Sequence, residues 1–436
     1  MDTREKQWEL LAKEVDRRGG DGKAVVEAYK ELYSVHSEKI CSWLGGLYDP
    51  EVGGFYYSNS ARDNEYWERE DGTRHYFLPD IESTNQATNF LQSSGMIKEF
   101  DEVPTWMRDK LVEFCSSLID PEDGYIYHPQ WKKNIKLSRR GRDLNWAIAM
   151  EDKFNFKLPY PTAIERLKEG EDNPDKKEEL LANMPDHLKS KEAFLEYLNS
   201  LDWVEKAYPA GNFVTAQGTQ IIAAGLGDVA VEFLNSIQNP QTGTWGKFTD
   251  YEAINGLLKI SGVYQQAERA FPHPLEAAMT AMNCLTLDTE CGAVVWQYNA
   301  WFSIRNITEN LRKFGGAEGC ALADKIVTEC LKRAPAAILS SAKKAQPFLC
   351  DDGAYSYTPP FSSCTSQAAF VSLGLKEGDV NATVINCTGI IYNSLRALDL
   401  VDFYVPLFDS HCFEIFLNEA KKPKKKLGFV NQNSQK

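Results

Sequence analysis

The sequence predicts an all-α protein in which about six helical hairpins form a ring of the (α/α)6 type around a central cavity. Two observations support this prediction. Segments with apolar residues at helical spacing alternate along the chain with short turns that pair glycine with an aromatic residue. These turns recur, and hairpins of this kind cannot bury their apolar faces alone, so neighbouring hairpins must stack or the array must close.

The first turn begins at Asp49 and contains Gly53-Gly54-Phe55. Glycine supplies a positive φ and lets backbones approach, while the aromatic ring fills the space beside it. The polar segment from Ser60 to Thr73 is expected to be a loop or lid. Ser83 or Thr84 is expected to cap the helix that follows.

Four further turns begin at Asp120, Asn239, Asp288 and Asp351, the one at Asp288 being the weakest copy. The five starting residues lie 71, 119, 49 and 63 positions apart, and the longest interval leaves room for one more hairpin. The chain therefore contains about six hairpins of roughly 50–70 residues each. Within the long interval, residues 191–237 are predicted to form two helices around a turn at Gly211.

The hairpins are expected to form one domain, residues 1–420. Residues 165–190 are dense in charge and are expected to be an exposed insertion or solvated helix. Residues 421–436 are rich in lysine and polar residues, so a disordered basic tail is predicted there.

Composition excludes several classes of protein. The 436 residues carry a net charge of −14, which argues against nucleic-acid binding because phosphates require clustered Lys and Arg. The ten cysteines form no CxxC motif and are expected to be reduced. A charged N-terminus and the lack of a long apolar run predict a cytoplasmic protein that neither carries a secretory signal nor spans a membrane.

Two of the turns, Asn239 to Trp245 and Asp351 to Tyr355, carry a resemblance to a known superfamily. Each is followed within about 20 residues by a polar N-cap and a helix rich in Ala or Leu. They resemble the repeats of α/α-toroid enzymes, namely terpenoid cyclases and protein prenyltransferase β subunits. Similar hairpins occur in six-hairpin glycosidases and toroid polysaccharide lyases. The resemblance covers roughly residues 25–415 and implies a ring enzyme acting on an isoprenoid or a carbohydrate.

The chain departs from the isoprenoid branch of this superfamily. It lacks the Asp-x-Asp-Asp motif that the resemblance to terpenoid cyclases would imply. Asp288 and Cys291 do not have the Asp-x-Cys spacing of the prenyltransferase zinc ligands. No metal or other cofactor is expected, and the glycosidase and lyase branch is favoured.

Glycoside hydrolysis needs one protonated and one ionised carboxyl group. The candidates are Asp80 and Glu82, which lie at the start of a predicted helix, and Asp143 and Asp250 at the matching points of later hairpins. The alternative is structural, because acidic residues stabilise helix N-termini in any protein.

His75 and Tyr76 precede these acids and could serve as base and acid in a lyase. The alternative is an ordinary histidine in a loop.

Aromatic residues are the candidates for sugar binding. At helical spacing Tyr298, Trp301 and Arg305 share a face that could stack on a sugar, or that could be ordinary core. The other candidates are Trp146, Trp245, Trp296, Tyr355 and Tyr357.

The basic run from Lys132 to Arg142 could bind a carboxylate or phosphate, or could be a solvated loop. We favour an enzyme that hydrolyses a glycoside, with a small molecule or oligosaccharide as partner. A lyase or sugar isomerase, a terpenoid cyclase-like or prenyltransferase-like enzyme, and a non-catalytic helical scaffold stay as alternatives.

Overall fold

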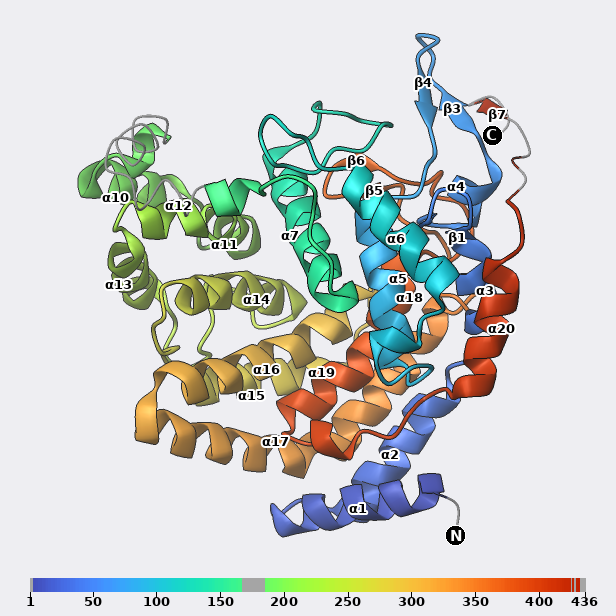
Figure 1. Ribbon diagram of the computed structural model, residues 1–436. Coiled ribbons are helices and arrows are strands. Elements are labelled where there is room, and N and C mark those ends of the chain that lie inside the picture. Colours follow the sequence, from blue (N-terminus) through green and yellow to red (C-terminus); the bar gives the residue numbers. More distant parts are fainter. Residues whose placement is uncertain (1–2, 167–184, 425, 427–428, 432–436) are drawn as a thin grey trace.

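The computed structural model describes residues 3–166, 185–424, 426 and 429–431 (Figure 1). This part of the chain is mostly helical, which confirms the predicted all-α class. Most of the predicted charged insertion, residues 167–184, lies outside the described residues. None of the helices in the described ranges combines the length and apolar character needed to cross a bilayer.

Six helical segments follow one another in contact and form an inner row, in the order α7, α5, α18–α19, α16, α14 and α11. The segment α18–α19 is one rod, because a single π-helical turn, Ile385–Gly389, joins its two parts. The bounds are α5 Ile81–Ser93, α7 Leu137–Phe154, α11 Ala207–Ala216, α14 Tyr251–Gln266, α16 Val295–Phe314, α18 Val380–Val384 and α19 Ile390–Ala397. Closure of this row into a ring stays a prediction.

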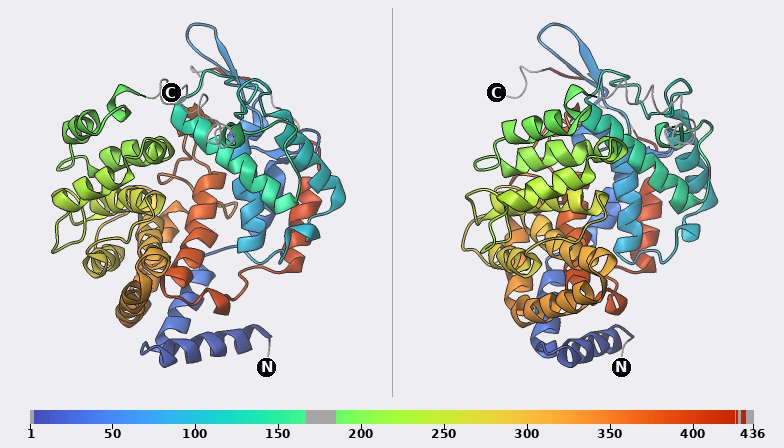
Figure 2. Two further views of the ribbon diagram at one scale, coloured as in Figure 1. Left: turned by 60° about the vertical axis from the view of Figure 1, so that its left-hand side comes forward. Right: turned by 90° about the vertical axis from the view of Figure 1, so that its left-hand side faces the viewer.

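The other long helices flank this row. Of these, α6 packs on α7, α13 on α14, and α15 and α17 on α16, while α2 packs on α17, α1 on α2, α10 on α13 and α3 on α20. Figure 2 shows α1 lying across the end of the bundle. The bounds of this set are α1 Thr3–Arg17, α2 Gly22–Ser34, α3 Lys39–Leu47, α6 Thr105–Ser117, α10 Lys191–Ser200, α13 Gly227–Ile237, α15 Pro274–Leu285, α17 Gly316–Ala345 and α20 Ser410–Ala420. One continuous apolar core joins residues from Trp8 of α1 to Ala420 of α20.

The remaining elements are short. The helical ones are α4 Asn59–Asp63, α12 Gly218–Ala223 and the 3-10 turns Phe100–Glu102, Asp186–Leu188, Gln346–Phe348 and Val401–Phe403. Three small sheets join β1 Tyr48–Asp49 with β2 Gly54–Phe55, β5 Thr365–Ser366 with β6 Ala369–Phe370, and β4 Arg74–Tyr76 with β3 Tyr66–Glu68 and β7 Phe429–Asn431.

The turn at Asp49 has the predicted local chemistry. The Asp49 carboxylate accepts hydrogen bonds from the backbone N–H groups of the second and third residues after it, at 3.0 and 3.2 Å. Gly53 then adopts φ +86° and donates to the Asp49 carbonyl oxygen. A β-carbon at Gly53 would lie 2.1 Å from the carbonyl oxygen of Lys110, so this turn requires glycine.

The turns at Asp120 and Asn239 repeat this arrangement, with Gly124 and Gly243 in the left-handed region. The weak copy at Asp288 does not, because its Gly292 has no positive φ. The predicted turn at Gly211 was wrong, since Gly211 lies inside α11 and its face packs against α14.

The segment predicted as a polar loop, Ser60 to Thr73, holds most of α4 and the strand β3. With β4, which follows that segment, β3 forms a hairpin that projects from the bundle (Figures 1 and 2). Tyr66 pairs with Tyr76 across the hairpin, and β7 from the C-terminal end adds a parallel strand to β3. The strand β7, Phe429–Asn431, lies within the predicted basic tail, and its backbone continues this sheet.

Candidate functional site

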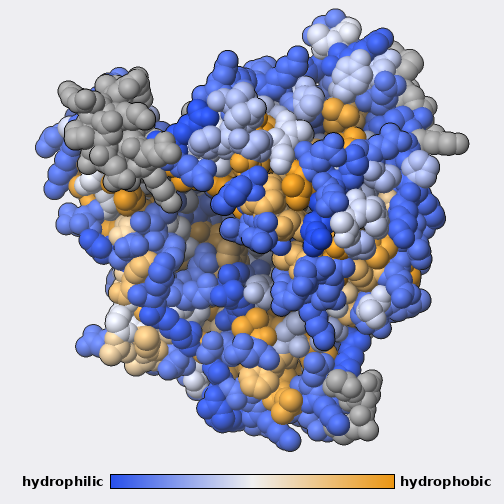
Figure 3. Space-filling view, in the orientation of Figure 1, coloured by the Kyte–Doolittle hydropathy of each residue, from blue (hydrophilic) through white to orange (hydrophobic). Residues whose placement is uncertain are grey.

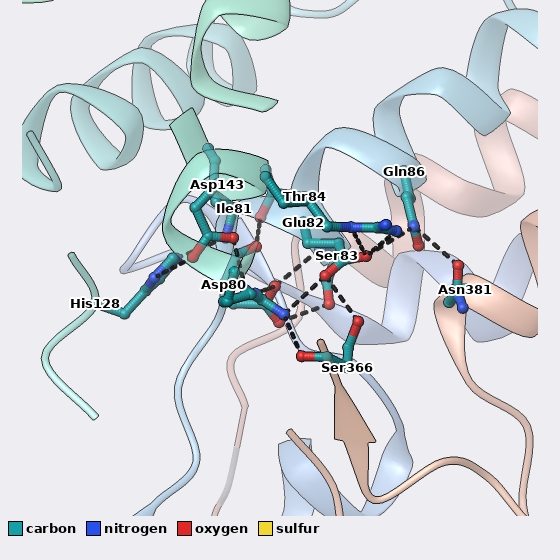
Figure 4. Close-up of polar contacts among 12 residues, drawn as sticks. Asp80, Ile81, Glu82, Ser83, Thr84, Gln86, His128, Asp143, Ser366 and Asn381 are labelled. Carbon is teal, nitrogen blue, oxygen red and sulfur yellow. Dashed lines mark hydrogen bonds and ion pairs between the residues drawn. The ribbon is translucent and has the colours of Figure 1, made fainter. Parts of the chain in front are cut away.

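A buried guanidinium group, that of Arg139, binds three carboxyl groups. They belong to Asp80, Glu82 and Asp143, which Figure 4 shows close to one another. Arg139 Nη2 lies 3.1 Å from Asp80 Oδ1, its Nη1 lies 2.7 Å from Glu82 Oε2, and its Nε lies 2.7 Å from Asp143 Oδ1. None of the four side chains is more than 3% exposed. The structure thus brings together three of the predicted catalytic acids around a cation that the sequence placed only in a basic run.

The helix starts explain this convergence. Arg139 and Asp143 lie four residues apart in α7 and so project from the same face. Asp80 precedes α5 and Glu82 lies in its first turn, and α5 packs against α7. The four side chains therefore meet between two neighbouring helices of the inner row.

Asp80 also caps α5. Its carboxylate accepts hydrogen bonds from the backbone N–H of Ser83 at 3.0 Å and from the Ser83 hydroxyl at 2.7 Å. The predicted cap at Ser83 or Thr84 was therefore wrong by three or four residues, because the aspartate itself occupies the capping position. Asp80 therefore stabilises the N-terminus of a helix, as the structural alternative predicts, and it also forms an ion pair with Arg139.

Glu82 has two cationic partners and one hydroxyl donor. Arg142 Nη2 lies 2.6 Å from its Oε1, and the Ser366 hydroxyl donates to its Oε2 at 2.8 Å. Ser366 belongs to β5, far along the chain, and its carbonyl oxygen accepts a hydrogen bond from Arg139 at 3.1 Å. Gln86 Nε2 lies between Glu82 and Asn381 of α18. Glu82 thus joins α5, α7 and the segment from β5 to α18.

His128 completes the cluster and was not predicted. Its Nε2 accepts a hydrogen bond from the backbone N–H of Ile81 at 2.9 Å, so the proton of the neutral ring lies on Nδ1. That Nδ1 is 3.5 Å from Asp143 Oδ2. Burial, followed by the charge of Arg139, holds the pKa of His128 well below its usual value, and the ring is therefore neutral. The sequence gives no sign of this role beyond the position of His128 just after the second turn.

The three carboxyl groups differ in their proton affinity. Burial raises the pKa of Asp143 to about 7 against the opposing charge of Arg139. Burial also raises the pKa of Asp80. Burial alone would raise the pKa of Glu82, but the charges of Arg142 and Arg139 hold it below the usual value. The cluster therefore contains an ionised carboxylate, Glu82, and a carboxyl group, Asp143, that is partly protonated near neutral pH.

A hollow lies beside α7. Figure 3 shows the surface hollowed on the side of α7 that faces α11 and α14. Arg142 is the cluster member that reaches solvent, because its side chain is 32% exposed, and its guanidinium lies 5.5 Å from the ring of Trp146. Burial raises the pKa of three tyrosines from other elements, and the charge of Arg142 opposes that rise. They are Tyr208 of α11, Tyr298 of α16 and Tyr357, which follows the fifth turn.

Three predicted acid–base residues lie elsewhere. His75 is buried in β4 against the rings of Phe77 and Phe370, and burial lowers its pKa to about 4. Tyr76 is 44% exposed on the opposite face of the same strand. Asp250 is exposed and caps α14. Within the described part of the chain, none of the three forms a hydrogen bond or ion pair with the Arg139 cluster, because strand alternation and helix capping direct them away from it.

Several predicted sugar-binding aromatics are core residues. Trp245 is buried and donates to the Leu234 carbonyl oxygen, and Tyr355 is buried with its hydroxyl 2.7 Å from His36. Trp301 donates to Ser341 of α17, whereas Arg305 donates to Asn393 of α19.

The predicted shared face of Tyr298, Trp301 and Arg305 is therefore split, because α16 has neighbours on two sides. Tyr298 lies against Gly389 on the α19 side together with Arg305. Trp296 is half-buried and stacks on Tyr251 with ring centroids 4.6 Å apart.

Among the described residues no group of three or more His, Cys, Asp or Glu side chains has an arrangement suited to a metal ion. The ten cysteines are all free of disulfide bonds. Comparison of the chain with family models, with curated proteins and with solved structures found no match.

Proposed function

We propose that the inner row closes into a six-hairpin ring and that the protein is a carbohydrate-active enzyme that hydrolyses a glycoside. Asp143 is the general acid, and Glu82 is the ionised carboxylate that acts as base or nucleophile. One observation carries this assignment. Two neighbouring carboxyl groups on one guanidinium have their pKa values moved in opposite directions, as an acid and its partner require.

The wall beside the cluster supports a polar substrate over an isoprenoid. Arg142 and Trp146 of α7, Asn255 of α14 and Asn299 of α16 are half-buried, and the Asn299 amide donates to Asn255 at 2.8 Å. Carbohydrate hydroxyl groups need such donors and acceptors, while an apolar polyene would leave them unsatisfied. The arrangement also favours hydrolysis over a lyase reaction that uses His75 and Tyr76, because these two side chains lie on opposite faces of a projecting strand.

Access to Glu82 is controlled by Arg142. The carboxylate of Glu82 is about 1% exposed, and the guanidinium of Arg142 covers its Oε1. A substrate that enters the hollow therefore reaches Glu82 by displacing the Arg142 side chain, which is the part of the cluster open to solvent. Asp143 is buried beside them, with its Oδ1 2.7 Å from Arg139 Nε and its Oδ2 3.5 Å from His128 Nδ1.

The test is a screen of aryl glycosides and oligosaccharides with the wild type and with Asp143→Asn and Glu82→Gln. Each substitution keeps the shape of the side chain, and loss of a general acid or base is expected to reduce turnover by about 10²–10⁴-fold. Asp250→Asn is the matched control and is expected to retain activity, because Asp250 lies outside the cluster. Circular dichroism checks folding of each variant. No turnover of any sugar, together with binding of an isoprenoid, would refute the proposal.

A further inference from the structure

A small pocket of about 140 Å³ lies where α11 and α14 begin. Aromatic side chains form part of its wall, namely those of Tyr208, Phe248 and the buried Trp245. Tyr208 is 38% exposed, so part of its ring is open to a ligand. None of the described residues that line the pocket belongs to the Arg139 cluster.

A close backbone contact holds the two sides of the pocket together. Gly246 follows Trp245 with φ +82°, and a β-carbon there would lie 2.8 Å from the carbonyl oxygen of Val204. The next residue, Lys247, donates its backbone N–H to the same oxygen at 3.2 Å. Glycine therefore lets the loop before α14 pack on the residues before α11, and the pocket is formed without a ligand.

Glu252, which lines the pocket, occupies the position in α14 that Glu82 occupies in α5. Asp250 and Asp80 cap the two helices, and in each helix glutamate is the second residue. Glu82 is bound by two guanidinium groups, whereas the Glu252 carboxylate forms no ion pair or hydrogen bond within the described part of the chain. Burial, followed by the charge of Glu252, raises the pKa of Tyr208, as a carboxylate close to the phenol does.

The charged groups around the pocket balance one another. Glu205 is paired with Lys247 at 2.6 Å, and Lys206 and Glu252 contribute one charge of each sign. Two carboxylates and two ammonium groups sum to zero, so the pocket offers hydrogen-bond acceptors and donors without a net charge for a ligand to offset. A neutral ligand with hydroxyl groups on its edge and an apolar face matches these groups and the aromatic wall.

We propose that this pocket is a second sugar-binding site, which holds one neutral monosaccharide unit. The C–H face of the sugar ring stacks on Tyr208, and two adjacent hydroxyl groups donate to the Glu252 carboxylate. The pocket is smaller than the roughly 300–1,000 Å³ of sites for drug-sized ligands, so it accommodates a single ring and not an oligosaccharide. The site goes beyond the proposed hydrolysis, because its residues take no part in that reaction.

The experiment is a ligand-observed NMR titration, which suits the weak binding expected of one sugar unit. The probes are the methyl glycosides of glucose, galactose and mannose, with those of glucosamine and glucuronic acid as charged analogues. The full chain is compared as wild type, Tyr208→Ala and Glu252→Gln. Tyr160→Ala removes a tyrosine that is 45% exposed outside the pocket, and Glu192→Gln removes an exposed glutamate from the second position of α10.

The wild type is expected to bind at least one neutral glycoside. Glu252→Gln is expected to weaken this binding about tenfold, because charge-assisted hydrogen bonds are lost, and Tyr208→Ala about fivefold, because the stacking surface is lost. The two control variants should bind as the wild type does. No binding of any neutral glycoside, binding unchanged in both pocket variants, or tighter binding of a charged analogue would overturn the inference.

The same titration with Glu82→Gln separates the pocket from the proposed active site. Binding that survives Glu82→Gln but falls in Tyr208→Ala would assign the sugar to the pocket, even if the protein turned over no glycoside and the hydrolase were refuted. Binding that is lost in Glu82→Gln and retained in Tyr208→Ala would place the sugar at the Arg139 cluster. That result would refute the pocket and leave the hydrolase standing.

Discussion

Replacing Arg139 with methionine tests whether the buried cluster depends on its central cation. Methionine keeps most of the aliphatic length of arginine, so the change removes charge and hydrogen bonds with little loss of packing volume. Three carboxyl groups that are at most 3% exposed would lose their common partner. Removing one partner of a buried ion pair costs about 3–5 kcal/mol of unfolding free energy, and we expect a loss of that size.

The loss should depend on pH. Without the opposing charge of Arg139, burial holds the folded-state pKa values of Asp80 and Asp143 still further above their unfolded values. Acids with such raised pKa values carry no penalty where both states are protonated and acquire one as pH rises through the folded-state pKa. The difference in stability between wild type and Arg139→Met is therefore expected to be larger at pH 8 than at pH 5.

The assay is urea unfolding followed by tryptophan fluorescence at both pH values. Arg17→Met is the control, because it removes an exposed arginine that pairs with Glu14 within α1, where solvent screens the interaction. The control should unfold close to the wild type. A loss for Arg139→Met no greater than that of the control, or one that grows as pH falls, would refute the stabilising role of the buried cation.

Three further predictions concern single residues. Because the folded-state pKa of Asp143 is raised to about 7, protonation of Asp143 favours the folded state, and wild-type stability is expected to fall as pH rises from 4 to 8. Asp143→Asn is expected to remove this contribution to the pH dependence. Equal slopes of melting temperature against pH for the wild type and Asp143→Asn would contradict this. Trp301→Ala is expected to lose about 3–5 kcal/mol in denaturant unfolding, since the ring is fully buried, and a loss below 1 kcal/mol would place the ring outside the core. Gly53→Ala should lower the melting temperature more than Gly72→Ala. Both glycines have a positive φ, but only at Gly53 would the added β-carbon lie 2.1 Å from a backbone carbonyl oxygen. Equal effects of the two substitutions would argue against that contact.

The turns were predictable because their chemistry is local. An Asx side chain binds the backbone two residues ahead, and glycine four residues after it supplies the positive φ, as at Asp49 and Gly53. The same logic failed at Gly211, where glycine serves the close approach of α11 to α14. A single sequence cannot separate these two uses of glycine, because the second depends on a helix that lies about 50 residues away.

The acids at the site were predictable, but their shared partner was not. Asp80, Glu82 and Asp143 were identified by their expected positions at helix starts. The structure places the first two at the start of α5, whereas Asp143 lies inside α7, which begins at Leu137. Arg139 lies in a basic run that resembles a solvated loop, and its burial depends on the packing of α5 against α7 and on the β5 segment more than 200 residues away. The spacing of four between Arg139 and Asp143 was the one local signal of an ion pair.

The aromatic candidates show the limit of helical periodicity. Spacing places Tyr298, Trp301 and Arg305 on one side of α16, but two neighbouring helices, α17 and α19, both pack against α16. Trp301 contacts α17 and the other two contact α19. Periodicity identifies the buried stripe of a helix, whereas the division of that stripe between core and cavity depends on how its neighbours are placed.

The division of acid and base roles has the same origin. Asp80, Glu82 and Asp143 would all be ionised at neutral pH in the unfolded chain, and Arg139 and Arg142 can neutralise only two of them in a buried space. We expect the proton to stay on Asp143, which has fewer cationic partners than Glu82. Glu82 has both guanidinium groups and the Ser366 hydroxyl, while Asp143 has Arg139 and a neutral imidazole. The proposed assignment of the acid to Asp143 therefore rests on the number of its partners, a property that exists only once α5, α7 and β5 have come together.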